Sequence, residues 1–184
     1  MGDIQKLNTI DEDDNIVGED SRENIHRKGL LHREVHVWIY NKKGEILFQK
    51  RSMTKDTYPG LLDASAGGHV ELNDNYDEAA VRELEEETGI KTNKNDLTYI
   101  TKIRKKSYDK ITSMTNNVIR IVYAYEYDNE QEIKLEKGKA DSLEFWPLEK
   151  IFNISEEDRK KFISVIISRE YINIFRKIQG LIKE

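Results

Sequence analysis

The stretch GHVELNDNYDEAAVRELEEETGI, residues 68–90, decides how the rest of the chain is interpreted. A glycine-rich turn, AGGHVELND, leads into a segment that carries the start and stop signals of a short helix. Asp74 or Asn75 can cap the first turn, and Gly89 suits a left-handed C-terminal stop. At about 100° per residue, one side of this helix collects Ala80, Val81, Leu84 and Thr88.

Glu83, Glu86 and Glu87 fall on another side of the predicted helix, within one turn of each other. Carboxylates at these spacings repel one another by roughly 0.2–0.5 kcal/mol per pair. A divalent cation turns that repulsion into attraction, and hard oxygen ligands on a rigid element suit Mg²⁺ or Mn²⁺. The alternative is a solvated, glutamate-rich helix face. The glycine turn, the spacing and the presence of Arg82 count against it.

The same stretch resembles the Nudix box, which reads Gly, five residues, Glu, seven residues, then Arg-Glu-apolar-any-Glu-Glu-any-Gly-apolar. One of the nine fixed positions departs from the pattern, because Asp74 stands where the family has a glutamate. In the family this residue more often braces the motif near the arginine than carries the main metal. The other fixed positions match at Gly68, Arg82, Glu83, Leu84, Glu86, Glu87, Gly89 and Ile90.

The resemblance implies an α+β protein with the Nudix fold, a mixed β-sheet between α-helices. It implies a metal-dependent hydrolase that cleaves a diphosphate linkage in a nucleoside diphosphate derivative or a related small phosphorylated compound, with Mg²⁺ or Mn²⁺ as cofactor. Its catalytic and metal-binding carboxylates would be Glu83, Glu86 and Glu87. A backbone carbonyl at Gly67 or Gly68 would complete the metal shell.

Arg82 would orient these glutamates, since one guanidinium fork can hold two carboxylates. The alternative is that Arg82 makes an ordinary ion pair on the helix, and the two interpretations overlap. A further carboxylate from outside the motif often acts as base or extra ligand in the family. Glu126 and Glu144 are the candidates, and the sequence does not choose between them.

The likeness extends to a Nudix branch close to isopentenyl diphosphate isomerase, through the run LLHREVHVWIYNKKGEILFQKRSMTKDTYPGLLDASAGGHVE. Arg51 and Lys55 match positions that hold a diphosphate in the isomerases; otherwise they are solvated loop cations. The isomerases use a cysteine before the helix, whereas this chain has Gly67 there and no cysteine anywhere. His69 would contact substrate or a metal-bound water, or else bond to the backbone. The hydrolase is therefore favoured over the isomerase.

A binding module and an RNA-processing enzyme are the two further alternatives. A non-catalytic, nucleotide-binding Nudix module usually loses motif glutamates, and this chain keeps them. A messenger-RNA decapping enzyme would show a larger basic face, but 35 acidic against 30 basic residues give a net charge of −5. The substrate class within small diphosphates stays open. A homodimer also stays open, because it is common in the family.

The chain has 184 residues, which suits one domain with modest additions. The lack of cysteine excludes disulfides, thiolate zinc sites and a cysteine nucleophile. No apolar run approaches the roughly 18 residues needed to cross a membrane, and the acidic N-terminus is unlike a secretory signal. The expectation is a cytoplasmic protein with no membrane partner and no general nucleic-acid binding.

Residues 1–33 are expected to form an N-terminal extension packed on the domain. IDEDDNIVG predicts two half-strands around a turn, with a calcium loop as the alternative. Ser21 is predicted to cap the helix SRENIHRK, which Gly29 closes. His26 and His32 are interpreted as surface or packing histidines, because no cluster of ligands surrounds them at ligand spacing in the sequence.

Residues 34–152 are expected to form the Nudix domain. EVHVWIY alternates as a half-buried strand does, NKKGE predicts a hairpin turn, and EILFQKR predicts the return strand. LTYITKIRKKSY, NNVIRIVYAYEY and LEFWPL predict three further strands. Three aromatic residues are equally candidates for stacking on substrate or for packing: Trp38, Tyr58 and Tyr108.

Residues 153–184 are expected to form one C-terminal helix of the same domain, opened by Ser155. Its apolar stripe favours packing against the sheet over a dimer or membrane role. The stripe consists of Phe162, Ile163, Ile166, Ile167, Ile174, Phe175 and Ile178.

Overall fold

The computed structural model describes residues 5–55, 57–135, 138 and 140–182. The ends of the predicted extension and C-terminal helix, residues 1–4 and 183–184, lie outside the described residues. The strands are β1 (Lys6–Ile10), β2 (Ile16–Ser21), β3 (His32–Tyr40), β4 (Glu45–Arg51), β5 (Leu62–Asp63), β6 (Ala66–His69), β7 (Leu97–Asp109), β8 (Met114–Glu126) and β9 (Ala140–Pro147). The helices are α1 (Arg22–Lys28), α2 (Tyr76–Thr88), α3 (Leu148–Phe152), α4 (Glu156–Arg159) and α5 (Arg169–Gln179), with 3-10 turns η1 (Lys94–Asp96) and η2 (Ser164–Ile167).

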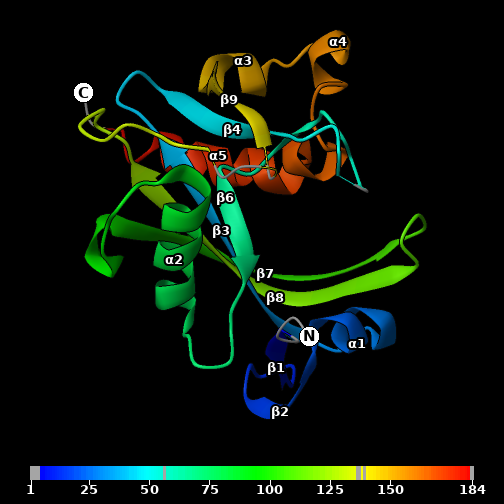
Figure 1. The fold of residues 1–184 in the computed structure, drawn as a ribbon. Coiled ribbons are helices and arrows are strands. Elements are labelled where there is room, and N and C mark those ends of the chain that lie inside the picture. Colours follow the sequence, from blue (N-terminus) through cyan, green and yellow to red (C-terminus); the bar gives the residue numbers. More distant parts are fainter. Residues whose placement is uncertain (1–4, 56, 136–137, 139, 183–184) are drawn as a thin grey trace.

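The architecture is α+β, as predicted: a mixed sheet carries α2 on one side and α5 on the other (Figure 1). Strand β3 is its centre. It runs parallel to β8, from His32 opposite Val118 to Tyr40 opposite Glu126. It runs antiparallel to β6, where Gly67 lies opposite His36. This register places the short glycine-containing strand directly beside the middle of the sheet.

Residues 34–40 lie in a strand, as predicted, but the prediction that this strand is half-buried is wrong. The strand begins at His32, and both of its faces are buried. Val35 and Val37 pack in the core under α2, while Trp38 packs in the core under the C-terminal segments. The alternation was misleading because Trp38 and His36 face a second core rather than solvent.

The segment interpreted as a glycine-rich turn is, from Ala66 to His69, a strand in the sheet. Glycine suits position 67 of this strand because the neighbouring atoms leave no room for a side chain. A Cβ at Gly67 would lie 2.8 Å from the His36 ring and from the Val35 carbonyl oxygen. Contacts between neighbouring segments, rather than turn geometry, explain this glycine.

The single helix predicted for residues 153–184 is also wrong. The chain forms α4, η2 and α5 in succession. Between α4 and η2 the chain runs beside β5. There the Leu62 amide donates to the Lys161 carbonyl at 2.8 Å, and the Ile163 amide donates to the Leu62 carbonyl at 3.0 Å. These bonds replace helical ones, and the β-branched run that follows weakens helix formation. The apolar stripe is nevertheless buried against the sheet, as expected: Phe162, Ile163, Ile166, Ile167, Ile174, Phe175 and Ile178.

The N-terminal segment forms the predicted hairpin, β1 with β2, followed by the predicted capped helix α1. Ser21 Oγ accepts from the Asn24 amide at 3.2 Å, and Gly29 ends the helix at φ 65°. The hairpin joins the sheet through Thr9, which pairs with His32. The boundaries at residues 33/34 and 152/153 remain predictions.

The acidic turn of this hairpin is tied to neighbouring strands. The Asp14 carboxylate accepts from Arg33 Nε at 2.8 Å, from Lys102 Nζ at 2.9 Å and from the Tyr76 hydroxyl at 3.0 Å. Asp11 accepts from the Asn15 amide at 2.8 Å. These contacts give the acidic residues a structural role, and the calcium-loop alternative gains no support. Within the described residues, no helix has the length and apolarity that a membrane span requires.

Candidate active site

Helix α2 presents the acidic motif on a well-defined scaffold. Asn75, rather than Asp74, is the N-cap; its side chain accepts from the Glu78 amide, and the Glu78 carboxylate accepts from the Asn75 amide in return. Gly89 ends the helix at φ 71°, as predicted. Val81 lies outside the buried side on which it was expected. The buried residues are Ala79, Ala80, Glu83, Leu84, Glu87 and Thr88.

Arg82 is the centre of the motif's hydrogen bonds. Its Nε donates to Asp74 Oδ2 at 3.0 Å, and its Nη1 donates to Glu83 Oε1 at 2.8 Å and to Glu86 Oε2 at 3.4 Å. Its Nη2 donates to the His69 carbonyl at 3.0 Å. Burial lowers the pKa of Arg82, but Asp74 and Glu83 outweigh burial and hold the pKa above its ordinary value. The guanidinium therefore stays charged and links the helix to β6.

Residues of the sheet contact Glu87 and Glu83. Glu87 Oε2 accepts from Gln49 Nε2 at 2.6 Å and from the Gly67 amide at 3.2 Å. The side chain of Glu83 is only 8% exposed, whereas that of Glu86 is 48% exposed. A Cβ at Gly68 would lie 2.3 Å from the Glu83 carboxylate, so only glycine permits this approach. The sequence did not indicate Gln49.

This donor set fits a hard divalent cation. Three carboxylates lie within one turn of one helix, and two of them are largely buried. Oxygen ligands without nitrogen or sulfur partners suit Mg²⁺ or Mn²⁺. The close approach of Gly68 to Glu83 also brings the backbone of β6 beside this carboxylate. The structure thus brings Glu83, Glu86 and Glu87 together on one side of α2, and their roles as metal ligands remain a proposal.

A cleft of about 1120 Å³ opens beside β6. Arg51, His69, Tyr58 and Tyr108 all line it. Arg51 is oriented there by Asp63 at 3.1 Å and by the Thr57 carbonyl at 3.0 Å, while Lys55 is not among the described lining residues. The third aromatic candidate, Trp38, is fully buried in the core and does not reach the cleft.

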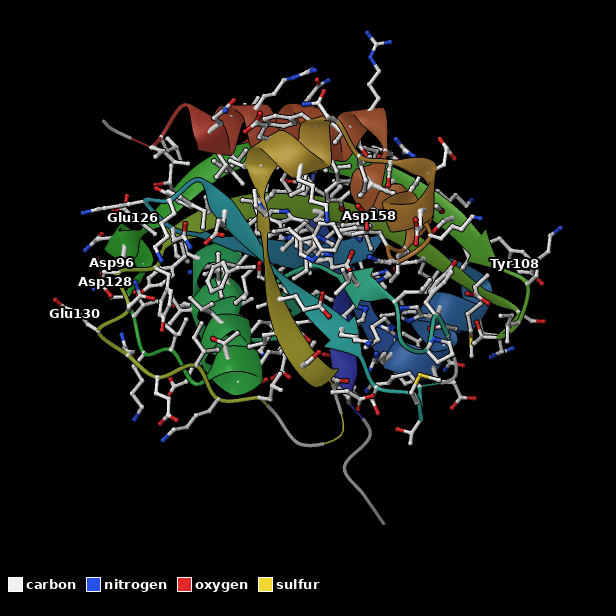
Figure 2. All side chains as sticks on the ribbon, turned by 90° about the horizontal axis from the view of Figure 1, so that it is seen from above. Asp96, Tyr108, Glu126, Asp128, Glu130 and Asp158 are labelled. Atoms are coloured by element: carbon white, nitrogen blue, oxygen red, sulfur yellow. The ribbon has the colours of Figure 1, made fainter. Side chains whose placement is uncertain are left out.

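Both candidates for an outside carboxylate bond to residues that do not belong to the motif. Glu126 accepts from the Tyr40 hydroxyl at the far end of β8, at the opposite edge of the molecule from Tyr108 (Figure 2). Glu144 pairs with Phe48, whose side chain belongs to the core on the α5 side, and it accepts from Trp146 Nε1. Sequence alone could not exclude them, because strand register and face decide their position.

A different carboxylate, Glu34, lines the cleft in a buried network. Its Oε2 accepts from Arg120 Nε at 2.9 Å. Arg120 also donates to the Tyr171 hydroxyl, which lies 3.3 Å from His36 Nδ1. Burial and the positive charge of Arg120 lower the pKa of His36 to about 3, so the His36 ring is neutral beside this hydroxyl. These residues come from β3, β8 and α5, and no local motif indicated them.

The reason given for interpreting His26 and His32 as surface or packing histidines, the lack of a ligand cluster, does not hold in the structure. Together with His69 they form a group whose ligand atoms all lie within 4.8 Å of one another. That reason considered only partners close in sequence, whereas the group is assembled from α1, β3 and β6.

Comparison with known proteins agrees with the fold and the motif. The model of the NUDIX domain family matches residues 30–166, so the chain belongs to the Nudix family. A Nudix hydrolase of Clostridium acetobutylicum is 33% identical over 132 residues, which cover 70% of this chain and 61% of that protein. A Nudix hydrolase from Nostoc sp. is 32% identical over 135 residues, which cover 73% of this chain and 80% of that protein. One from Yersinia pestis is 41% identical over 87 residues, 47% of this chain and 48% of that protein.

The matched segments thus span about half to three-fifths of the Yersinia and Clostridium proteins. Among solved structures, the DR0079 protein of Deinococcus radiodurans has a TM-score of 0.67 at 20% identity and covers 94% of this chain and 98% of that chain. The MutT protein of Methanosarcina mazei has a TM-score of 0.60 at 23% identity, and the match covers 84% of this chain and 96% of that chain. These likenesses confirm the predicted Nudix fold.

Proposed function

We propose that this protein is a metal-dependent hydrolase that cleaves the diphosphate linkage of a nucleoside diphosphate derivative or a related small phosphorylated compound. The single observation that carries the proposal is the guanidinium of Arg82, which holds Glu83 and Glu86 at one end and the His69 carbonyl at the other. Together with the bond from Gln49 to Glu87, this arrangement holds three carboxylates side by side, and a cation offsets their mutual repulsion. Membership of the Nudix family supports the same activity.

Glu83, Glu86 and Glu87 would hold the metal, with a backbone carbonyl of Gly67 or Gly68. When bound, Mg²⁺ or Mn²⁺ neutralises charge on the phosphate oxygens and lowers the pKa of water. The chain's own task is to hold the three carboxylates in position. Arg82 does this from the helix, and Gln49 does it from β4 through its 2.6 Å bond to Glu87.

The substrate would lie in the cleft beside β6. Arg51 offers the diphosphate a guanidinium already oriented by Asp63 and Thr57, and His69 lines the same cleft. Tyr58 and Tyr108 are 47% and 61% exposed at its walls and suit stacking on a base or another flat group. Lys55 remains a weaker candidate for the diphosphate, because it lies outside the described lining.

The test is a panel of nucleoside and non-nucleoside diphosphate compounds with Mg²⁺ or Mn²⁺, followed by phosphorus NMR. ADP-ribose belongs in the panel, since the Nudix domain of Shewanella oneidensis NrtR, similar in fold, was solved with it. The proposal predicts metal-dependent products from one compound class. Turnover should disappear in Glu86→Gln and Glu87→Gln, whose side chains keep their size.

The matched control is Glu85→Gln, because Glu85 lies on the same helix but pairs with Lys91 away from the motif. Full activity in the Glu86 and Glu87 variants would overturn the metal assignment. Nucleotide binding without turnover of any compound would instead indicate a binding module. An isomerase gains no support, since Gly67 offers no acid–base group and its missing side chain would point at His36.

A further inference from the structure

The wall of the cleft contains a charged pair that the proposed metal site does not use. Glu34 on β3 lies opposite His69 on β6 and opposite Arg120 on β8. Residues that lie opposite each other on neighbouring strands point to the same face of a sheet. All three side chains line the cleft. The pair of Glu34 and Arg120 is therefore presented to whatever occupies the cleft.

This pair is largely removed from water. The side chains of Arg120 and Glu34 are 8% and 13% exposed. Burial of two charges costs several kcal/mol per ion, and apolar residues of similar volume at such positions are often as stable or more stable. Stability alone therefore does not explain why charged residues stand on this wall.

The geometry of the pair leaves one carboxylate oxygen of Glu34 without a donor. Nε and Nη2 of Arg120 both donate to Oε2, and Nη1 donates to the Tyr171 hydroxyl instead. Within the part of the chain that the structure describes, no hydrogen bond reaches Oε1 of Glu34. A guanidinium fork commonly engages both oxygens of a carboxylate. Here it engages one and leaves the other to the cleft.

The charge of the cleft wall restricts the donor that can use this oxygen. Burial raises the pKa of Glu34, but the charge of Arg120 outweighs burial and lowers the pKa to about 2. The carboxylate is therefore ionised and can only accept hydrogen bonds. Arg51 and Lys105 line the same cleft, and their charges would repel a cationic ligand. The matching donor is an uncharged group, such as a hydroxyl.

A second acceptor without a donor lines the same cleft. Asn116 lies four residues before Arg120 on β8, so the two side chains share a face of the strand. Its Oδ1 is buried and has no hydrogen-bond partner among the described residues. A buried acceptor without a donor costs about 1–3 kcal/mol. Two acceptors in one cleft favour a ligand that brings several hydroxyl groups.

We propose that Glu34 is a specificity-determining residue that accepts a hydrogen bond from a sugar hydroxyl of the substrate. The preferred compounds are then diphosphates that carry a sugar, rather than diphosphates of a group without hydroxyls. Arg120 is a positioning residue, because it holds Oε2 of Glu34 and leaves Oε1 to the cleft. The inference rests on the proposed function for the place of the diphosphate, beside Arg51 in the same cleft.

The test compares the binding of ADP-ribose with that of two analogues of equal charge. In one analogue a pentyl group replaces the terminal ribose, and in the other 2′,3′-dideoxyadenosine replaces adenosine. Calorimetry with a chelator present gives the dissociation constants without metal-dependent hydrolysis. The wild type should bind at least one analogue about 10–100-fold more weakly than ADP-ribose, which is the value of a hydrogen bond to a charged group. The weaker analogue identifies the sugar that contacts Glu34.

The informative variant replaces the whole pair, Glu34→Leu together with Arg120→Met. An apolar pair of similar volume keeps the fold, whereas removal of one partner leaves a buried charge. The Tm should stay near that of the wild type, since the Tyr171 hydroxyl keeps His36 as a partner. The preference for ADP-ribose over the weaker analogue should disappear in this double variant.

The matched control is Asp14→Asn together with Arg33→Met. Arg33 precedes Glu34 on β3, and its ion pair with Asp14 is also partly buried but lies outside the described lining of the cleft. This control should keep the preference for ADP-ribose.

Three results would overturn the role of Glu34. They are equal binding of all three compounds by the wild type, no measurable binding of ADP-ribose, and a preference that the double variant keeps. None of these measurements includes turnover, so they are separate from the phosphorus NMR panel. An intact preference without metal-dependent products in that panel would contradict the hydrolase and leave the role of Glu34 in binding standing.

Discussion

Arg82 Nη1 lies 2.8 Å from Glu83 Oε1 and 3.4 Å from Glu86 Oε2, so one guanidinium nitrogen bridges two carboxylates of the same helix. The remaining nitrogens of the fork reach Asp74 and the His69 carbonyl. A lysine offers a single point charge and cannot make these divergent bonds together. The geometry thus requires arginine, not merely a cation.

Arg82→Lys should therefore lower hydrolysis by about 10–100-fold, the usual cost of removing a group that orients metal ligands. Steady-state rates and Mg²⁺ affinity measure the effect. Arg176→Lys is the control and should behave as the wild type, because Arg176 is exposed on α5, where it donates to Asn173 and lies over the Phe152 ring. Unchanged activity in Arg82→Lys would show that the bridging geometry is not needed.

Gly68→Ala should abolish turnover and lower stability, because the new Cβ would lie 2.3 Å from the Glu83 carboxylate. The carboxylate must move, and the metal affinity should fall with it. Calorimetric Mn²⁺ titration measures this loss. Gly18→Ala provides the comparison: its Cβ would meet the Thr9 hydroxyl at 3.2 Å, which can rotate away. A Gly68→Ala protein with normal Mn²⁺ affinity would contradict the close approach.

Glu34→Gln should destabilise the protein by about 3–5 kcal/mol at neutral pH, because Arg120 would be left buried without its charged partner. The charge of Arg120 overcomes burial and lowers the pKa of Glu34 to about 2. Glu34 therefore contributes stability above its unfolded pKa of about 4.3, and this contribution is lost as the pH falls toward 2.

Denaturant unfolding at several pH values measures the Glu34 effect. The difference in free energy of unfolding between wild type and Glu34→Gln should shrink as the pH drops below about 4. Glu19→Gln removes an exposed partner of Lys6 and should change stability little. A wild-type to Glu34→Gln difference that stays constant down to pH 2 would mean that the pKa of Glu34 is not lowered.

Phe175→Ala should lower the free energy of unfolding by about 3–5 kcal/mol, since it would leave a cavity in the core on the α5 side. Phe175 is fully buried and packs edge-to-face on Trp38 with centroids 4.8 Å apart. Chemical denaturation gives the free energy, and Phe152→Ala at a partly buried position should cost less. Equal costs would show that α5 is not an integral part of the core.

The sequence by itself determined the features that depend on residues close along the chain. The helix at residues 76–88 has its cap at Asn75 and its stop at Gly89 because those signals act within one turn. The spacing of Glu83, Glu86 and Glu87 follows from helical periodicity alone. Strands β7 and β8 were also predicted, since a run rich in β-branched and aromatic residues is a local property.

Only the tertiary structure decided the features built from distant segments. Gln49 reaches Glu87 from another strand, and Glu34 meets Arg120 because β3 and β8 run in parallel. The three clustered histidines come together from α1, β3 and β6, although their spacing in sequence indicated nothing. Strand register and the packing of layers set these distances, and neither is encoded in any short stretch of the chain. The physical reason is that local signals fix dihedral angles, whereas long-range burial fixes which faces meet.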